Sequence, residues 1–123
     1  MRPARVLPLL VALLAGPAAG MDVAPDTDRA LWCGSAFFWL ATDAYDAGED
    51  AEATDYEAWS EALLGTGVAA LAAAGTDEAT IGALLDAYDG EVLDALGTDK
   101  ARFDIITCLT LAEALPPLAA PAP

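Results

Sequence analysis

The chain has 123 residues, and 20 acidic side chains against five basic ones give it a formal charge of −15 at neutral pH. A surface this acidic repels phosphate backbones and anionic lipids, which argues against binding to nucleic acids or to a membrane surface. The sequence contains no histidine, so it lacks the usual general base of hydrolases and the commonest zinc ligand.

Residues 1–20 have the three-part layout of a secretory signal peptide. A short positive start is followed by an apolar run over residues 6–15, and Ala18 and Gly20 then stand at positions −3 and −1 of a cut before Met21. A membrane anchor is the alternative, but prolines and glycines interrupt this segment. It is also shorter than the ~20 apolar residues that a spanning helix needs. The sequence therefore predicts cleavage and a periplasmic or secreted protein that is not held in the membrane.

Removal of the signal peptide leaves three basic residues against 20 acidic ones, a formal charge of −17. About 100 mature residues suffice for one domain with a modest core, and we assign this helical domain to residues 21–115. The remaining residues, 116–123, are rich in proline and alanine and cannot continue a helix. We expect them to form a flexible tail.

Four helices are predicted after the signal peptide, because four Thr-Asp pairs provide signals for helix N-termini. These pairs begin at Thr27, Thr54, Thr76 and Thr98. The second pair also has the spacing of a capping box, with Glu57 three residues after Thr54. In each pair the threonine can accept a hydrogen bond from a free backbone N–H, while the aspartate lies favourably in the first turn.

Three glycines indicate where the first three helices end. Gly48, Gly75 and Gly97 each follow an apolar periodic segment, the usual place of a C-terminal stop. At residues 75–77 and 97–99 the glycine is followed directly by the next Thr-Asp pair, which favours tight turns between antiparallel helices. The predicted fold class is therefore all-α, a small antiparallel bundle of about four helices.

The last two predicted helices each carry one apolar stripe. The third has Ile81, Leu84, Leu85, Tyr88, Val92 and Leu96. The fourth has Ala101, Ile105, Cys108, Ala112 and Leu115. Such spacing predicts one buried face on each helix. Residues 105–107 are β-branched and would also suit a strand, but we favour a helix because no partner strand is evident.

The second predicted helix is rich in alanine, and Gly65 and Gly67 interrupt its middle. Glycine weakens a helix, so these two positions indicate either a kink or close packing against a neighbouring helix.

The first predicted helix is apolar on nearly every side. Cys33, Phe37, Leu40 and Ala44 form one stripe, Leu31, Phe38 and Tyr45 form another, and Trp32 and Trp39 lie on a third side. A helix of this kind is either central in its bundle or keeps one face for a partner. The central position is the simpler interpretation, because a small bundle needs its aromatic residues for the core.

Cys33 and Cys108 are the only cysteines, and in an exported chain they are expected to pair. Both lie on apolar stripes, so the bond would join the first helix to the last. Closing a loop of about 75 residues removes roughly 4–5 kcal/mol of unfolded-chain entropy. Two buried free thiols are the alternative if the chain is not exported.

The segment Trp32-Cys33-Gly34-Ser35 resembles the start of the active-site motifs of thioredoxin-like oxidoreductases and papain-like proteases. Both motifs require a second cysteine where Ala36 stands, and the proteases also require a histidine. Glycine-rich phosphate loops and serine nucleophile elbows are absent as well. We therefore expect a structural disulfide, no catalytic residue, no cofactor and no enzymatic activity.

Six acidic residues gather around the first interhelical turn: Asp43, Asp46, Glu49, Asp50, Glu52 and Asp55. Oxygen ligands alone can bind calcium. In an EF-hand register Gly48 takes position six and Asp43 position one. Tyr45, Ala47 and Thr54 would then occupy three of the ligand positions, so a solvated acidic loop is favoured over a metal site.

Leu31-Trp32-Cys33, with a second cysteine near the end of the chain, resembles small exported one-disulfide helical proteins of Gram-negative bacteria. The plan of signal peptide, compact helical domain and long-range disulfide is also similar to that of periplasmic acid-stress chaperones. This resemblance implies a periplasmic helical protein and assigns no functional residue.

We expect a non-catalytic exported protein that acts through contacts with another, basic protein. The candidate partner surface consists of Trp32, Trp39, Asp43 and Asp46, because tryptophan is favoured as a binding anchor and acids steer a basic partner. Two alternatives remain open. One is an acid-stress chaperone, whose aromatic first helix becomes exposed when carboxylates are protonated at about pH 4. The other is a weak divalent-cation binder at the acidic turn.

Overall fold

The computed structural model of the protein describes residues 23–116. The predicted signal peptide and nearly all of the predicted tail lie outside this range. The regular elements within it are four helices: α3 (Pro25–Asp46), α4 (Asp50–Ala73), α5 (Glu78–Ala95) and α6 (Ile105–Ala114). The predicted all-α fold is therefore confirmed. None of the described helices is long and apolar enough to cross a membrane.

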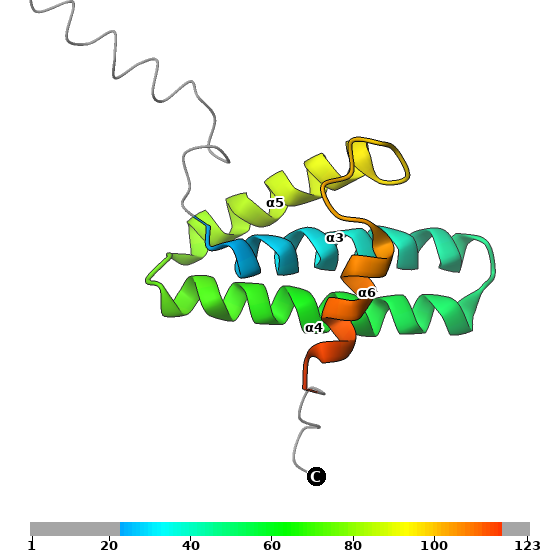
Figure 1. Cartoon of the computed structure of the whole chain (residues 1–123), viewed down its shortest axis with the longest axis horizontal. Helices are drawn as coiled ribbons and strands as arrows, with labels where there is room; N and C mark the ends of the chain where they lie inside the picture. Colours follow the sequence, from blue (N-terminus) through cyan, green and yellow to red (C-terminus); the bar gives the residue numbers. More distant parts are fainter. Residues whose placement is uncertain (1–22, 117–123) are drawn as a thin grey trace, which may run out of the picture.

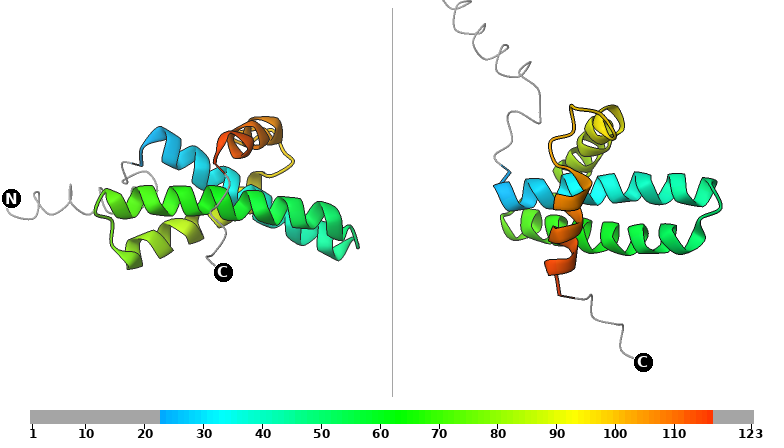
Figure 2. Two further views of the ribbon diagram at one scale, coloured as in Figure 1. Left: turned by 90° about the horizontal axis from the view of Figure 1, so that it is seen from below. Right: turned by 45° about the vertical axis from the view of Figure 1, so that its right-hand side comes forward.

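Helices α3 and α4 form a long antiparallel hairpin, and the other two helices pack on its opposite faces. Helix α5 runs obliquely beside α3, whereas α6 crosses α3 and α4 steeply (Figure 1). A view from below places α5 and α6 on either side of the hairpin (Figure 2). The loop over residues 96–104 carries the chain from one face to the other.

Helix α3 is the central element, as its apolar pattern predicts. It contacts all three other helices, and every residue from 30 to 37 is buried. Leu31, Trp32 and Phe37 have no exposed surface. The apolar stripe of α5 is also confirmed, because its members are buried or packed against the core. The residues of the fourth predicted stripe likewise pack on the core, and residues 105–114 form a helix and not a strand.

Helices α3 and α4 approach closely at two glycines. A Cβ atom on Gly67 would lie 2.5 Å from Cδ2 of Leu31, and one on Gly34 would lie 2.7 Å from Cγ of Leu64. The prediction of close packing is thus confirmed for Gly67. A Cβ atom on Gly65 would meet no neighbour within 4 Å, because this residue lies on the exposed side of the helix.

The glycine stops are confirmed, since Gly48, Gly75 and Gly97 have φ angles of 77°, 88° and 78°. Left-handed backbone of this kind ends a helix and is readily adopted by glycine. The predicted third helix begins at its Thr-Asp pair, but the cap is Asp77 rather than Thr76: Asp77 accepts a 2.8 Å hydrogen bond from the backbone N–H of Thr80.

The other predicted helix starts need correction. Helix α3 begins at Pro25, in the first-turn position that suits proline, rather than at Thr27. Helix α4 begins at Asp50, so Thr54 is inside the helix and donates to the Asp50 carbonyl instead of forming a capping box. Helix α6 begins after Asp104, which accepts a 2.7 Å hydrogen bond from the backbone N–H of Thr107.

Thr98 does not begin a helix. Its hydroxyl donates a 2.6 Å hydrogen bond back to the carbonyl of Ala95, at the end of α5. The predicted tight turn at residues 97–99 is therefore replaced by a longer connection. This connection lets α6 cross the hairpin steeply instead of lying antiparallel to α5 (Figure 1).

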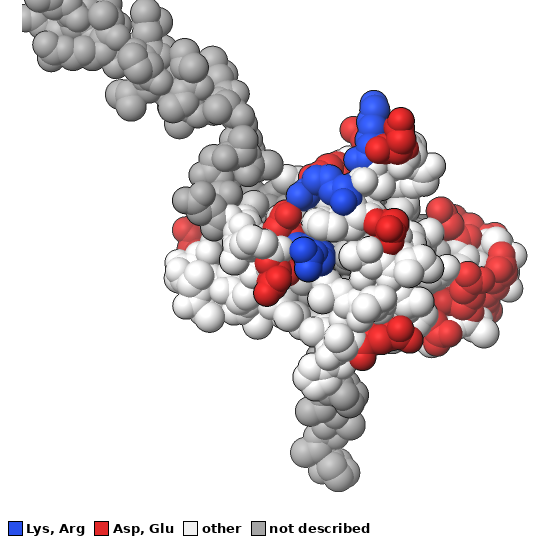
Figure 3. Space-filling model, in the orientation of Figure 1, with Lys and Arg blue, Asp and Glu red and all other residues white. Residues whose placement is uncertain are grey.

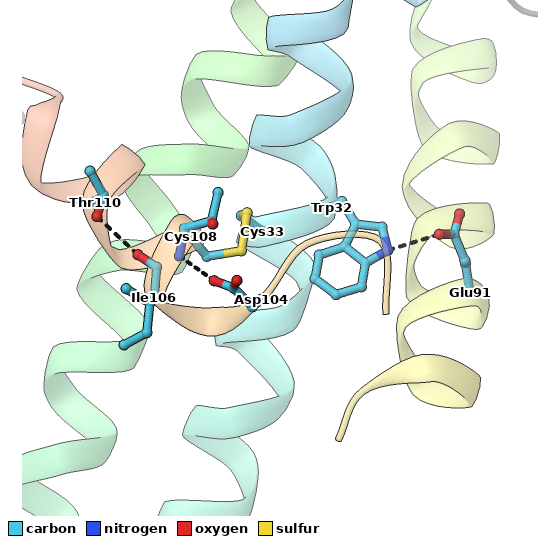
Figure 4. Close-up of a disulfide and its surroundings, with 8 residues drawn as sticks. Trp32, Cys33, Glu91, Asp104, Ile106, Cys108 and Thr110 are labelled. Carbon is cyan, nitrogen blue, oxygen red and sulfur yellow. Dashed lines mark hydrogen bonds between the residues drawn. A yellow bond between two sulfur atoms is a disulfide. The ribbon is translucent and has the colours of Figure 1, made fainter. Parts of the chain in front are cut away.

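Cys33 and Cys108 form the predicted disulfide, with their Cα atoms 5.2 Å apart and a sequence separation of 75. Both cysteines have no exposed surface. The bond joins the middle of α3 to α6 (Figure 4). Because neither described cysteine is free, the alternative of two buried thiols is wrong.

Candidate functional site

The residues predicted to form the partner surface do not lie together. Trp32 has no exposed surface, and its indole N–H donates a 2.8 Å hydrogen bond to Glu91 of α5 (Figure 4). The 96–104 loop covers it as well, because the Phe103 ring packs edge-on at 5.6 Å between centroids. Assigning Trp32 to an exposed surface is therefore wrong, since this side of α3 faces α5 and the loop.

Trp39 is partly buried, packs against the core, and lies edge-on to Phe38 at 5.1 Å between ring centroids. Its indole nitrogen is buried and has no hydrogen-bond partner among the described residues. Asp43 and Asp46 are exposed near the end of the same helix. Of the predicted set, these two acids are the clearly accessible members.

A polar cluster surrounds the buried Trp32. Arg102 donates to both oxygens of Asp28, at 2.8 Å and 3.1 Å, and to both oxygens of Glu91, at 2.5 Å and 3.2 Å. The hydroxyl of Tyr88 donates to Asp28 at 2.5 Å. The cluster thus connects α3, α5 and the 96–104 loop. Its groups are paired with one another, which is typical of a structural network.

The pKa values of this cluster reflect that pairing. Partial burial acts to raise the pKa of Asp28, but hydrogen bonds from Arg102 and Tyr88 outweigh it and hold the pKa below its usual value. Burial, together with the hydrogen bond to Asp28, raises the pKa of Tyr88. The hydrogen bond to Asp28 also raises the pKa of Arg102. At neutral pH the aspartate and arginine are therefore charged and the tyrosine is neutral.

The acidic residues of the first interhelical turn are not gathered into a metal-binding geometry among the described residues. Within residues 23–116, no group of three or more acidic or cysteine side chains is arranged to hold a metal ion. The hydroxyl of Tyr56 donates a 2.8 Å hydrogen bond to Glu52, and a hydrogen bond with Glu52 raises the pKa of Glu49. All six predicted ligands are exposed. This geometry gives no support to the divalent-cation alternative.

Two of the four exposed large apolar side chains among the described residues, Phe38 and Tyr45, lie along the groove between α3 and α4. Phe38 and Tyr45 are 46% and 43% exposed, although both are aromatic. They line a depression of about 250 Å³ together with Leu64 of α4. The complete lining is Phe38, Ala41, Thr42, Tyr45, Glu57, Ser60, Glu61 and Leu64.

A second depression of about 160 Å³ adjoins the first on the side of α5. Phe38 and Leu64 line both, so the two depressions are neighbours on one surface. The second is completed by Ser35, Leu85, Tyr88 and Asp89. We call the two together the Phe38 groove.

The charge around the Phe38 groove is negative. Glu57 and Glu61 contribute to its first depression and Asp89 to its second, and the described lining contains no lysine or arginine. Asp89 accepts a 2.5 Å hydrogen bond from the hydroxyl of the buried Ser35. Further acids cluster at the α3–α4 turn, whereas the lysine and arginines lie nearer to α6 and the 96–104 loop (Figure 3).

The sequence contained a partial signal for this groove. Phe38 and Tyr45 lie seven residues apart on one helical stripe, but the stripe also contains Leu31, which is fully buried. Leu64, Glu57 and Glu61 had no distinguishing signal, because only the pairing of α3 with α4 brings them beside Phe38. Comparisons with protein families, with characterised proteins and with solved structures find no match to this chain.

Proposed function

We propose that the protein is an exported, non-catalytic helical domain that acts through contacts with a basic protein partner at the Phe38 groove. The observation that carries this proposal is the pair of half-exposed aromatic side chains, Phe38 and Tyr45, in an acidic surface depression. Aromatic residues are enriched at the cores of protein interfaces. Carboxylates at the rim would steer a cationic partner toward them.

Export is supported by the disulfide and by the predicted signal peptide. Disulfides form and persist in oxidising compartments such as the periplasm, and they are rare in the cytosol. The Cys33–Cys108 bond is fully buried and lies among apolar residues, as expected for a structural bond. In Gram-negative bacteria such a chain would act in the periplasm, in line with the small one-disulfide proteins that it resembles.

A binding role fits the groove better than catalysis. Its lining offers carboxylates, hydroxyls and apolar side chains, and the chain has no histidine to act as a general base near neutral pH. The Ser60 hydroxyl is buried and donates a 2.8 Å hydrogen bond to the carbonyl of Gly34, so it is engaged in the helix packing.

The proposal can be tested with groove variants of the mature chain. Wild-type protein and the double variant Phe38→Ser/Tyr45→Ser would be used to capture partners from a periplasmic extract of the source cells. We expect a basic protein that is retained by the wild type and lost with the double variant, and that binds again as a purified component in calorimetry. The control is Ile106→Ser, at a 72% exposed position on α6. Equal capture by the groove variant would contradict the proposal.

An acid-stress chaperone is a second candidate, favoured by the position of the cluster around Asp28. This cluster covers the buried Trp32, and it depends on two carboxylates, Asp28 and Glu91, that pair with Arg102. Protonation of Asp28 would remove its ion pair with Arg102, release the loop over residues 96–104 and expose the aromatic surface beneath it. The candidate predicts that the protein binds a hydrophobic dye and suppresses aggregation of an acid-denatured client below about pH 4. It fails if near-UV circular dichroism stays native there and the client aggregates as before.

A further inference from the structure

The shape of the Phe38 groove specifies what kind of segment it can bind. Its two depressions measure about 160 and 250 Å³. An apolar cavity of about 150 Å³ accommodates a benzene-sized group. Each depression therefore has room for at least one large apolar side chain. Phe38 and Leu64 line both depressions and would contact both inserted side chains.

The length of the groove matches a short helix. Along α3 its lining runs from Ser35 to Tyr45, which is about 15 Å at 1.5 Å per residue. A bound helix lying along it would place three turns over the groove. Its apolar side chains at positions i, i+4 and i+7 would then point toward the two depressions.

An extended segment fits less well. The groove lies between helices, whose backbone groups are already paired, so it offers no free strand edge. An extended peptide bound there would leave its own N–H and C=O groups without partners where they are covered. A helix satisfies these groups internally and can bury apolar side chains without that cost.

The charges around the groove favour a cationic partner. Glu57 and Glu61 lie one turn apart on α4, beside the first depression, and Asp89 lies at the second. A second copy of this chain is a poor occupant, because the predicted mature chain carries −17 and none of its three basic residues lines the groove. Arg102 is moreover paired with Asp28 and Glu91. Anionic lipid is repelled for the same reason.

We infer that the Phe38 groove binds a cationic amphipathic helix that inserts apolar side chains on both sides of Phe38. This inference rests on the proposed function and adds the conformation and the chemistry of the bound segment. Lysine or arginine residues on the flanks of that helix pair with Glu57 and Glu61, and its apolar stripe covers Phe38 and Tyr45.

The test uses two synthetic peptides with the same leucine and lysine content. One has its leucines at i, i+4 and i+7 on a single face, and the other has them distributed around the helix. Binding to the oxidised mature chain is measured by calorimetry, and peptide helicity by circular dichroism. We expect the amphipathic peptide to bind about ten-fold more tightly, a difference of about 1.4 kcal/mol, and to gain helicity on binding. Equal affinity of the two peptides would overturn the inference, because charge alone would then explain the binding.

Two pairs of variants locate the binding site. Phe38→Ser should weaken binding of the amphipathic peptide by about ten-fold, whereas Ile106→Ser should leave it unchanged. The double variant Glu57→Lys/Glu61→Lys should also weaken binding of the amphipathic peptide, and this loss of affinity should grow as the salt concentration is lowered. The control is Asp94→Lys/Asp99→Lys, which changes the charge by the same amount at exposed positions outside the groove and should have a much smaller effect. If a groove variant and its control lose the same amount of peptide affinity, the inference is overturned.

Binding at the Phe38 groove and the helical conformation of the bound segment can be refuted separately. A natural partner that is captured through Phe38 but contacts it with a non-helical segment refutes only the helix inference. Capture that does not depend on Phe38 and Tyr45 refutes the proposed function itself.

Discussion

The indole nitrogen of Trp32 donates a 2.8 Å hydrogen bond to Glu91, and this contact joins α3 to α5 although the two residues are 59 positions apart. Trp32 has no exposed surface, so its N–H has exchanged water for this carboxylate. Glu91 itself is partly exposed and also accepts from Arg102. One carboxylate therefore satisfies a buried donor and holds the 96–104 loop against α5.

Removing this acceptor should destabilise the protein. In Glu91→Ala the buried indole N–H loses its partner, and an unsatisfied buried donor costs about 1–3 kcal/mol. Glu91→Gln keeps an oxygen acceptor and should lose about 1 kcal/mol or less, since the ion pair with Arg102 is half exposed. Urea denaturation measures both, with Asp94→Ala on the exposed side of α5 as the control. Equal losses in the Ala and Gln variants would show that the hydrogen bond to Trp32 contributes little.

The disulfide should account for a large part of the stability. Replacing both cysteines, Cys33→Ala/Cys108→Ala, removes a cross-link that encloses nearly the whole bundle. We expect a loss of roughly 4–5 kcal/mol in the chain-entropy model, a large share of the ~5–15 kcal/mol typical of a domain. Calorimetry should give similar melting temperatures for the variant and for the reduced wild type, both below that of the oxidised wild type. A melting temperature that is insensitive to reduction would contradict this prediction.

Local signals in the sequence predicted the disulfide, the central helix and the glycine stops. These features depend on residues close together in sequence, or on the simple fact that two cysteines are present. The start of α6 was mispredicted because Thr98-Asp99 and Asp104 both provide capping side chains, and only tertiary packing decides between them. Placing the start at Asp104 frees residues 96–104 to cross from one face of the hairpin to the other.

The groove was harder to predict for a related reason. The first helix has apolar residues on nearly every side, so its sequence does not indicate which apolar side stays exposed. Packing of α5 and the 96–104 loop buries Trp32, while Phe38, six residues further along, remains half exposed. The rotation of α3 within the bundle therefore decides which aromatic residue can meet a partner.

Stability should depend on pH through Asp28. Its pKa is held below the usual value of 3.8 in the folded state by Arg102 and Tyr88, despite partial burial. A lowered folded-state pKa contributes stability that is full above the unfolded-state value and is lost as pH falls through the folded-state value. Asp28→Asn should therefore destabilise the protein by about 1 kcal/mol at neutral pH, after allowance for solvent screening.

The same prediction requires the difference between wild type and Asp28→Asn to shrink below about pH 4. Urea denaturation at several pH values measures it. The groups around Asp28, namely Arg29, Tyr88, Glu91 and Arg102, are unchanged in the variant. A difference that is constant from neutral to acidic pH would show that Asp28 acts through packing and not through its charge.

The close packing of α3 on α4 predicts opposite effects for two glycines that are two residues apart. In Gly67→Ala the new Cβ would lie 2.5 Å from Cδ2 of Leu31, whose side chain is fully buried and has little room to move. Overpacking of this kind costs about 1–3 kcal/mol. In Gly65→Ala the new methyl group meets no atom within 4 Å. Alanine there should stabilise the helix by about 0.5–1 kcal/mol, because glycine in a helix interior is unfavourable.

Thermal and urea unfolding of these two variants measure their difference in stability. The comparison is direct because the chemical change is identical and both sites lie in α4. If Gly67→Ala raised the free energy of unfolding instead, there would be room for a methyl group between Gly67 and Leu31, and α3 and α4 would not be in close contact there. The Phe38 groove would then change too, because Leu64, one turn before Gly67, lines both of its depressions. Gly67→Ala should accordingly weaken binding of the amphipathic peptide, whereas Gly65→Ala should leave that affinity unchanged.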